Sequence, residues 1–135
     1  MSYTIDEIQG IGPTYKEQFT AANVTTTEAL LEKCGTKLGR KAMAEVSGFT
    51  ESQLLDWTNM ADMMRINGVG GQFAELLKGT GVDTVKELAT RNPKNLTEAM
   101  EKLNAEKHLA KTQPSLSMVM KWIDEAKTLA PAISH

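Results

Sequence analysis

The sequence has 135 residues with 15 basic and 17 acidic side chains, and its net charge is -2. A chain of this length can bury a core without a disulfide or a metal, and its single cysteine, Cys34, excludes an intramolecular disulfide. The two histidines, His108 and His135, do not make a metal-ligand cluster of ordinary spacing. The acidic balance excludes a general attraction to nucleic acid, so any such binding depends on local cations. We predict neither a metal nor a cofactor.

The first ten residues, MSYTIDEIQG, carry acids where a signal peptide needs cations, and they lack an apolar run. Nowhere do about 18 apolar residues follow one another, which is the length that a membrane-spanning helix needs. Together with the single cysteine, these features predict a cytoplasmic protein that has no membrane partner.

Apolar residues recur at spacings of three and four along almost the whole chain, and no stretch alternates apolar and polar residues for long enough to indicate a sheet. The pattern predicts an all-α fold. In chain order, we expect helices over residues 4–9, 13–22, 27–34, 37–47, 51–66, 71–79, 84–90, 96–108 and 115–129. Residues typical of helix starts and stops flank many of these ranges. The candidate N-caps are Thr27, Thr36, Thr50, Asp83 and Ser115, and the candidate stops are Gly35, Gly48 and Gly81.

The chain resembles itself when it is shifted by 58 residues. The shift aligns Gly10 with Gly68, Gly12 with Gly70, Tyr15 with Phe73, Thr26 with Thr84 and Lys33 with Arg91. After an insertion of seven residues the match resumes, and Trp57 aligns with Trp122. We interpret this as an internal duplication, with one repeat over residues 1–59 and the other over 60–135. The helix expected over 51–66 joins them without a Gly or Pro break, so the repeats should form one compact body.

Each repeat contains two glycines one residue apart, in IQGIGPTYKEQF and in RINGVGGQFAEL. Both segments resemble the helix-hairpin-helix motif, in which glycines permit a tight turn and the apolar residue between them packs between two helices. The N–H groups at the start of the second helix and the helix dipole attract anions. The resemblance implies a SAM-like helical bundle of two helix-hairpin-helix units fused through a long central helix. It also implies that DNA phosphates bind without base recognition.

From Ile5 to Leu129 the chain is also similar to a bacterial family of unknown function that is built from tandem hairpins of this kind. The matching signatures are GIGP, LGRKAMAEVSGF, MADMMRINGVGG, GVDTVKELATRNPKNL and WIDEAKTL. This resemblance implies a fold and no particular biochemistry.

The residues expected to contact nucleic acid lie in the two turns and in a run of cations. The segment KCGTKLGRK at residues 33–41, here called the basic cluster, holds four cations and no acid, and its counterpart RNPKN holds two cations. DNA-binding hairpins usually carry Lys or Arg where this chain has Thr14 and Gln72. The candidates are Gly10, Gly12, Thr14 and Lys16 in the first hairpin, Gly68, Gly70 and Gln72 in the second, and Lys33, Lys37, Arg40, Lys41, Arg91 and Lys94 in the two cationic segments.

Each feature also has a plainer interpretation. The hairpins can serve only to pack helices, and a short run of cations often serves solubility. For Trp57 and Trp122, core packing is favoured over a platform that stacks bases. Methionines fill gaps between helices more often than they form a binding surface, and the residues concerned are Met60, Met63, Met64, Met118 and Met120.

DNA glycosylases share the hairpin and combine it with a catalytic aspartate and often with a lysine in the turn. Asp83 is the aspartate nearest that position, neither Gly-x-Gly turn holds a lysine, and the chain is too short to enclose an extruded base. We therefore predict a non-catalytic binding module for nucleic-acid backbone. The alternative is a protein-protein interaction adaptor or a homo-oligomeric scaffold.

Overall fold

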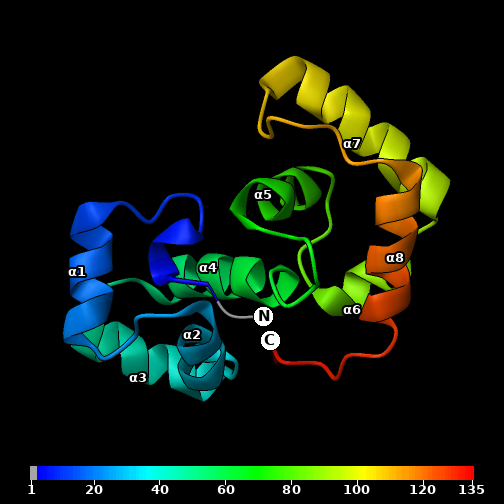
Figure 1. The fold of residues 1–135 in the computed structure, drawn as a ribbon. Coiled ribbons are helices and arrows are strands. Elements are labelled where there is room, and N and C mark those ends of the chain that lie inside the picture. Colours follow the sequence, from blue (N-terminus) through cyan, green and yellow to red (C-terminus); the bar gives the residue numbers. More distant parts are fainter. Residues whose placement is uncertain (1–2) are drawn as a thin grey trace.

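The computed structural model describes residues 3–135 and shows an all-α protein (Figure 1). Within these residues there are eight α-helices, one short 3₁₀ helix and no sheet. The one strand-like feature among them is an isolated bridge between Thr4 and Thr26. The predicted fold class, all-α, is confirmed.

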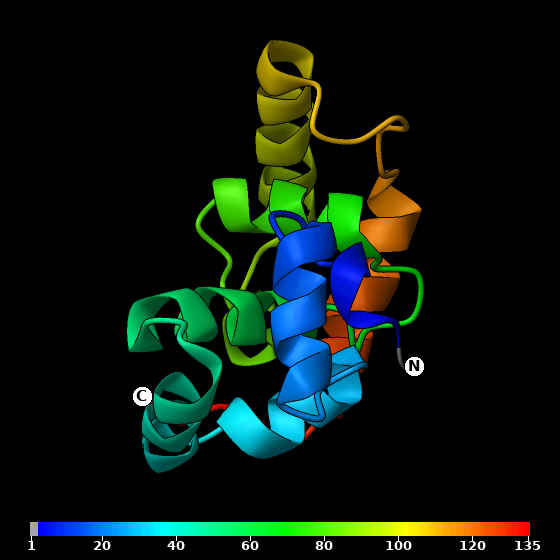
Figure 2. The same cartoon turned by 90° about the vertical axis from the view of Figure 1, so that its left-hand side faces the viewer.

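The elements follow one another as η1 (Ile5–Glu7), α1 (Pro13–Ala21), α2 (Thr27–Cys34), α3 (Lys37–Ser47), α4 (Glu51–Met63), α5 (Gly71–Gly79), α6 (Val85–Leu88), α7 (Pro93–Lys107) and α8 (Leu116–Ala126). Helix α4 runs through the middle of the fold and contacts α2, α3 and α5 (Figure 1). Helix α7 projects at one end and packs against α5 and α8 (Figure 2). None of these helices combines the length and the apolar character that crossing a lipid bilayer requires.

Side-chain caps define the starts of most helices. Three predicted caps accept a hydrogen bond from the backbone of the first turn: Thr36, Thr50 and Ser115. The other two predictions, Thr27 and Asp83, are each wrong by one residue. Thr26 caps α2 and Thr84 caps α6, because these threonines have the extended backbone that a cap requires.

The central helix is shorter than the sequence pattern predicts. It ends at Met63 rather than at residue 66. The amides of Arg65 and Ile66 donate to the carbonyls of Asp62 and Met63, three residues back, at 3.1 and 3.2 Å. These tighter bonds turn the chain into the second glycine turn.

Helix α7 is longer than predicted, because the segment RNPKN is the start of a helix and not a loop. Asn92 is the N-cap, and its Oδ1 accepts a hydrogen bond from the Asn95 amide at 3.0 Å. Pro93 follows at the first helical position, where no N–H donor is needed.

The core contains apolar residues from all eight helices. Trp57 and Trp122 are 9% and 3% exposed, so the prediction that both indoles pack in the core is confirmed. The methionines of the two helices differ in burial. On α8, Met118 is half-buried and Met120 is exposed, whereas the methionines of α4 and of its C-cap are buried. The buried ones are Met60, Met63 and Met64.

The two glycine turns have the same local geometry. Gly10 and Gly68 have φ angles of +95° and +87°, in the left-handed region that glycine adopts without strain. A Cβ atom on either would lie over an indole nitrogen, 3.6 Å from Trp57 Nε1 or 3.5 Å from Trp122 Nε1. The apolar residue of each turn donates its amide to the carbonyl three residues back, at 3.2 Å for Ile11 and 3.1 Å for Val69.

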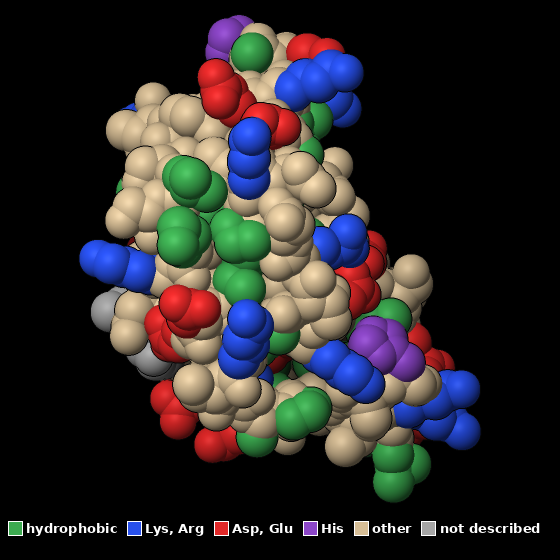
Figure 3. All heavy atoms as spheres, turned by 90° about the vertical axis from the view of Figure 1, so that its right-hand side faces the viewer, with side chains coloured by type: hydrophobic (Ala, Val, Ile, Leu, Met, Phe, Trp, Pro, Cys, Tyr) green, Lys and Arg blue, Asp and Glu red, His purple; other side chains and the backbone are tan. Residues whose placement is uncertain are grey.

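Four large aliphatic side chains remain exposed on two helices. Leu38 and Val46 of α3 are 78% and 72% exposed, and Leu116 and Met120 of α8 are 44% and 48% exposed. Figure 3 shows hydrophobic side chains grouped on the face that contains α8. The sequence pattern favoured gap filling for Met120 of α8, and its exposure corrects that interpretation; no pattern indicated an exposed apolar face on α3.

Candidate nucleic-acid interface

The first hairpin, residues 10–16, lies at the start of α1, the helix at the left edge of the molecule in Figure 1. Gly12, Pro13 and Thr14 are exposed, and Tyr15 is 37% exposed. Gly12 is the N-cap residue and offers no side-chain acceptor to the first turn of α1. A shallow pocket of about 190 Å³ is lined by Gly10, Gly12, Pro13, Thr14 and Tyr15. Pro13 has no N–H group, and the Lys16 amide donates to the Gly12 carbonyl at 2.9 Å. The donors that this turn offers to an anion are therefore the amides of Thr14 and Tyr15.

The lysine of the first hairpin already has a partner. Lys16 Nζ lies 3.4 Å from Asp6 Oδ2, and the two side chains are 49% and 38% exposed. A hydrogen bond from Thr4 lowers the pKa of Asp6, and Lys16 lowers it further. Asp6 is thus ionised at neutral pH and offsets part of the charge of Lys16. An anion at this turn is attracted mainly by the backbone N–H groups.

A carboxylate lies beside the second hairpin, residues 68–74, and binds the amide of the residue before it. Glu125 Oε1 accepts a hydrogen bond from the Asn67 amide at 3.0 Å. The residue that corresponds to Glu125 beside the first hairpin is Met60, since the same spacing of 65 residues relates Trp57 to Trp122. The first hairpin therefore has no carboxylate at the corresponding place. A phosphate near Asn67 would meet this negative charge.

Neighbouring segments also cover part of the second hairpin. Gly71 lies against the carbonyl oxygen of Glu7, and any Cβ on Gly71 would overlap that atom. Gln72, at the position where a DNA-binding hairpin usually has a cation, accepts a hydrogen bond from the Lys111 amide at 3.0 Å. Gly70 and Gly71 are half-buried, whereas Gly12 of the first hairpin is exposed. The two turns share a geometry but differ in accessibility.

The basic cluster lies at the far end of α1 from the first hairpin (Figures 1 and 2). Lys33 Nζ donates to the carbonyls of Ala22 and Asn23 at 3.2 and 3.3 Å, just beyond the last turn of α1. The nine residues of α1 span about 13 Å at 1.5 Å per residue. The length of α1 therefore separates the basic cluster from the first hairpin.

Arg40 is a buried structural residue and not an exposed cation, which corrects the expectation from the sequence. Its side chain is 3% exposed, and its guanidinium donates to the carbonyls of Cys34 at 3.0 Å, Gly35 at 3.2 Å and Ser134 at 2.7 Å. The Ser134 amide in turn donates to the Gly35 carbonyl at 2.8 Å. The exposed cations of the basic cluster are Lys33, Lys37 and Lys41.

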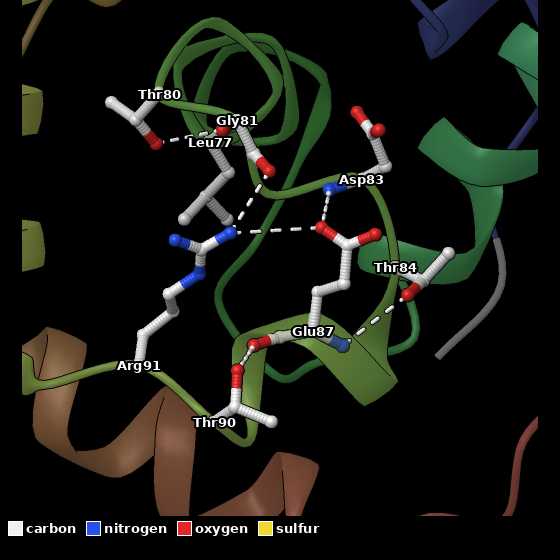
Figure 4. Close-up of polar contacts among 8 residues, drawn as sticks. All are labelled: Leu77, Thr80, Gly81, Asp83, Thr84, Glu87, Thr90 and Arg91. Carbon is white, nitrogen blue, oxygen red and sulfur yellow. Dashed lines mark hydrogen bonds and ion pairs between the residues drawn. The ribbon is translucent and has the colours of Figure 1, made fainter.

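In the counterpart segment, Arg91 points back to the turn after α5 (Figure 4). Its Nη2 donates to the Gly81 carbonyl at 3.1 Å and lies 3.7 Å from Glu87 Oε2, which also accepts from the Asp83 amide at 3.4 Å. Lys33 bonds the equivalent turn after α1, so these two cations support turns in both halves. Lys94 is exposed on the first turn of α7.

Two buried titratable groups were not predicted to be important. Asp62 is 2% exposed, and its oxygens accept hydrogen bonds from Arg65 Nη1 at 2.9 Å and from the Val85 amide at 2.8 Å, which ties α4 to α6. Burial raises the pKa of the Cys34 thiol to about 11, so it stays protonated at neutral pH. In residues 3–135, no three His, Cys, Asp or Glu side chains are grouped as a metal site would require.

The fold and this surface define an all-α protein in which one of two similar glycine turns presents an open helix start. The chain belongs to the family described as a domain of unknown function, DUF4332, which matches residues 9–129. The expectation of a family of unknown function is confirmed. No curated protein and no solved structure matches the chain.

Proposed function

We propose that the chain is a non-catalytic binding module made of two helix-hairpin-helix repeats. Equivalent hydrogen bonds 58 residues apart support the duplication: the amides of Val24 and Val82 donate to the carbonyls of Phe19 and Leu77 at 2.8 and 3.0 Å. The shared φ angles of Gly10 and Gly68 support the same hairpin in both repeats.

The ligand that we propose is the phosphodiester backbone of nucleic acid, bound without reading the bases. The observation that carries this proposal is the exposed, uncapped start of α1 after Gly12. Backbone N–H groups at a helix start bind phosphate through their hydrogen bonds and through the helix dipole. They contact no base edge, so they confer no sequence preference.

The structure limits the strength of such binding. Only one hairpin is open, and its lysine, Lys16, is shared with Asp6. Binding through one or two phosphates predicts a Kd of about 100 μM or weaker at low salt, at the weak end of non-specific binding. The slope of log K against log salt should lie between about -1 and -2 for duplex DNA.

A pair of matched variants tests this proposal. Thr14→Glu and Gln72→Glu change the net charge equally, and they stand at equivalent positions of the open and the covered hairpin. We expect Thr14→Glu to abolish binding of a fluorescent duplex at low salt, measured by anisotropy. Gln72→Glu should retain most of it, because its side chain still accepts from Lys111. Thr14→Lys should strengthen binding and steepen the salt slope by about one unit.

Equal losses in Thr14→Glu and Gln72→Glu would contradict the proposal, because a general charge effect would then explain both. Failure of duplex DNA, single-stranded DNA and RNA to bind the wild type at low salt would also contradict it. Incubation with duplex DNA should yield neither strand cleavage nor base release, with wild type or with Asp83→Asn.

A second candidate function is protein-protein contact as an adaptor or homo-oligomer. The observation that favours it is the exposure of Leu38 and Val46, at 78% and 72%, on one helix. Isolated exposed aliphatic residues are common, but a row along a helix is typical of an interaction surface. This surface lies on α3, whose last residue, Ser47, accepts a hydrogen bond from Gln18 of α1 at 3.3 Å.

A further inference from the structure

Helix α3 presents an apolar stripe to solvent in addition to its buried face. Leu38, Ala42 and Val46 are spaced by four residues and therefore lie on one side of the helix, and all three are exposed. The opposite side carries Arg40 and Met43, which are 3% and 6% exposed and fix the helix to the core. The stripe is thus held rigidly outward.

Two opposite charges flank the stripe on one side. Lys41 and Glu45 follow the same edge of α3, one turn apart, and both are exposed. Neither takes part in an ion pair within residues 3–135. The face therefore combines an apolar centre, a small residue in the middle and an unpaired charge of each sign.

We propose that this face binds a second copy of the chain, with the two α3 helices antiparallel about a twofold axis at Ala42. In that arrangement Leu38 of each copy lies opposite Val46 of the other, and the small Ala42 side chains meet at the axis. Because the twofold axis is perpendicular to both helices, the edge that carries Lys41 and Glu45 lies on the same side of the interface in both copies. Lys41 of one copy then lies next to Glu45 of the other, twice in the dimer.

Self-complementarity is the reason for choosing a second copy over another partner. An acidic partner would be favoured by Lys41 but disfavoured by Glu45, whereas an inverted copy satisfies both charges. The contact is one face of an 11-residue helix, which is smaller than a stable dimer interface. The expected dimer is therefore weak, with a Kd of micromolar or higher.

The inference rests on the second candidate function and names its partner, and charge variants test the proposed register. We expect wild type to show reversible dimerisation by sedimentation equilibrium as the concentration rises toward about 1 mM. Lys41→Glu or Glu45→Lys alone places like charges together and should weaken self-association by about tenfold or more. An equimolar mixture of these two variants should regain dimerisation as a heterodimer. One variant then carries acids at both positions 41 and 45, and the other carries lysines at both.

A second pair of variants tests the stripe itself. Leu38→Asp should abolish dimerisation, whereas Leu116→Asp, an equally drastic change at an exposed leucine of α8, should leave it intact. Both positions are exposed, so circular dichroism should show an unchanged fold. A wild type that stays monomeric at every concentration would overturn the proposal, as would a mixture that does not regain association. Loss of dimerisation in Leu116→Asp alone would place the interface on α8 instead. DNA binding should survive Leu38→Asp, which separates this result from the nucleic-acid proposal.

Discussion

Replacing Gly71 with alanine tests how closely η1 packs against the start of α5. Gly71 begins α5, and a Cβ atom there would overlap the carbonyl oxygen of Glu7 and lie 3.3 Å from its carbonyl carbon. The obstacle is backbone, which cannot rotate away as a side chain can. Either η1 or the start of α5 must shift. Overpacking of this kind costs about 1–3 kcal/mol, and the better helix propensity of alanine returns at most about 1 kcal/mol.

We therefore expect Gly71→Ala to lower the free energy of unfolding by about 1–3 kcal/mol, measured by urea denaturation with fluorescence of the two tryptophans. Gly70→Ala is the matched control. Its φ is -94°, and no heavy atom lies within 4 Å of the added Cβ, so its stability should change by less than about 0.5 kcal/mol. Equal stability of the two variants would refute the close packing of η1 on α5. Two separate unfolding transitions in wild type would contradict a single compact body.

The remaining predictions concern buried groups and the turn. Arg40→Ala should cost about 2–4 kcal/mol, because it removes charged hydrogen bonds to three carbonyls; a neutral result in urea denaturation would contradict its structural role. Trp57→Ala and Trp122→Ala should each cost about 3–5 kcal/mol, and both indoles should resist iodide quenching; exposed emission would contradict their burial. Gly68→Val should cost about 1–3 kcal/mol, because valine is strained at positive φ. Burial raises the pKa of the Cys34 thiol from 9.0 to about 11. The protonated thiol therefore contributes to the free energy of unfolding below pH 9, and this contribution is lost as the pH rises toward 11. Between those two pH values the free energy of unfolding should fall less in Cys34→Ala than in wild type. An equal fall in the two proteins would contradict the raised pKa of Cys34.

The positions of most helices could be predicted because their signals are local. Spacing of apolar residues, capping threonines and serine, and stop glycines all act within one or two turns of the helix concerned. The start of α7 was missed because RNPKN looks like a loop, although Asn before Pro is also a helix start. The end of α4 was missed because helix spacing continues through residues whose amides bond three residues back.

The candidate interface was predicted less well, because accessibility depends on residues distant in sequence. Ser134 accepts from Arg40 across 94 positions and removes this cation from the surface. Glu125 binds the Asn67 amide, next to the second hairpin, from 58 positions away. The glycine pattern predicts two similar turns and gives no sign that one of them is covered.

The most direct test of the proposed function is an NMR titration of the protein with a short DNA duplex at low salt, observing backbone amides. We expect the shifts to concentrate at Thr14, Tyr15 and Lys16 of the first hairpin. The equivalent amides of the second hairpin, Gln72, Phe73 and Ala74, should move much less, and added salt should reverse the shifts. Absence of shifts in the first hairpin, or shifts confined to the basic cluster at residues 33–41, would contradict phosphate binding at the start of α1.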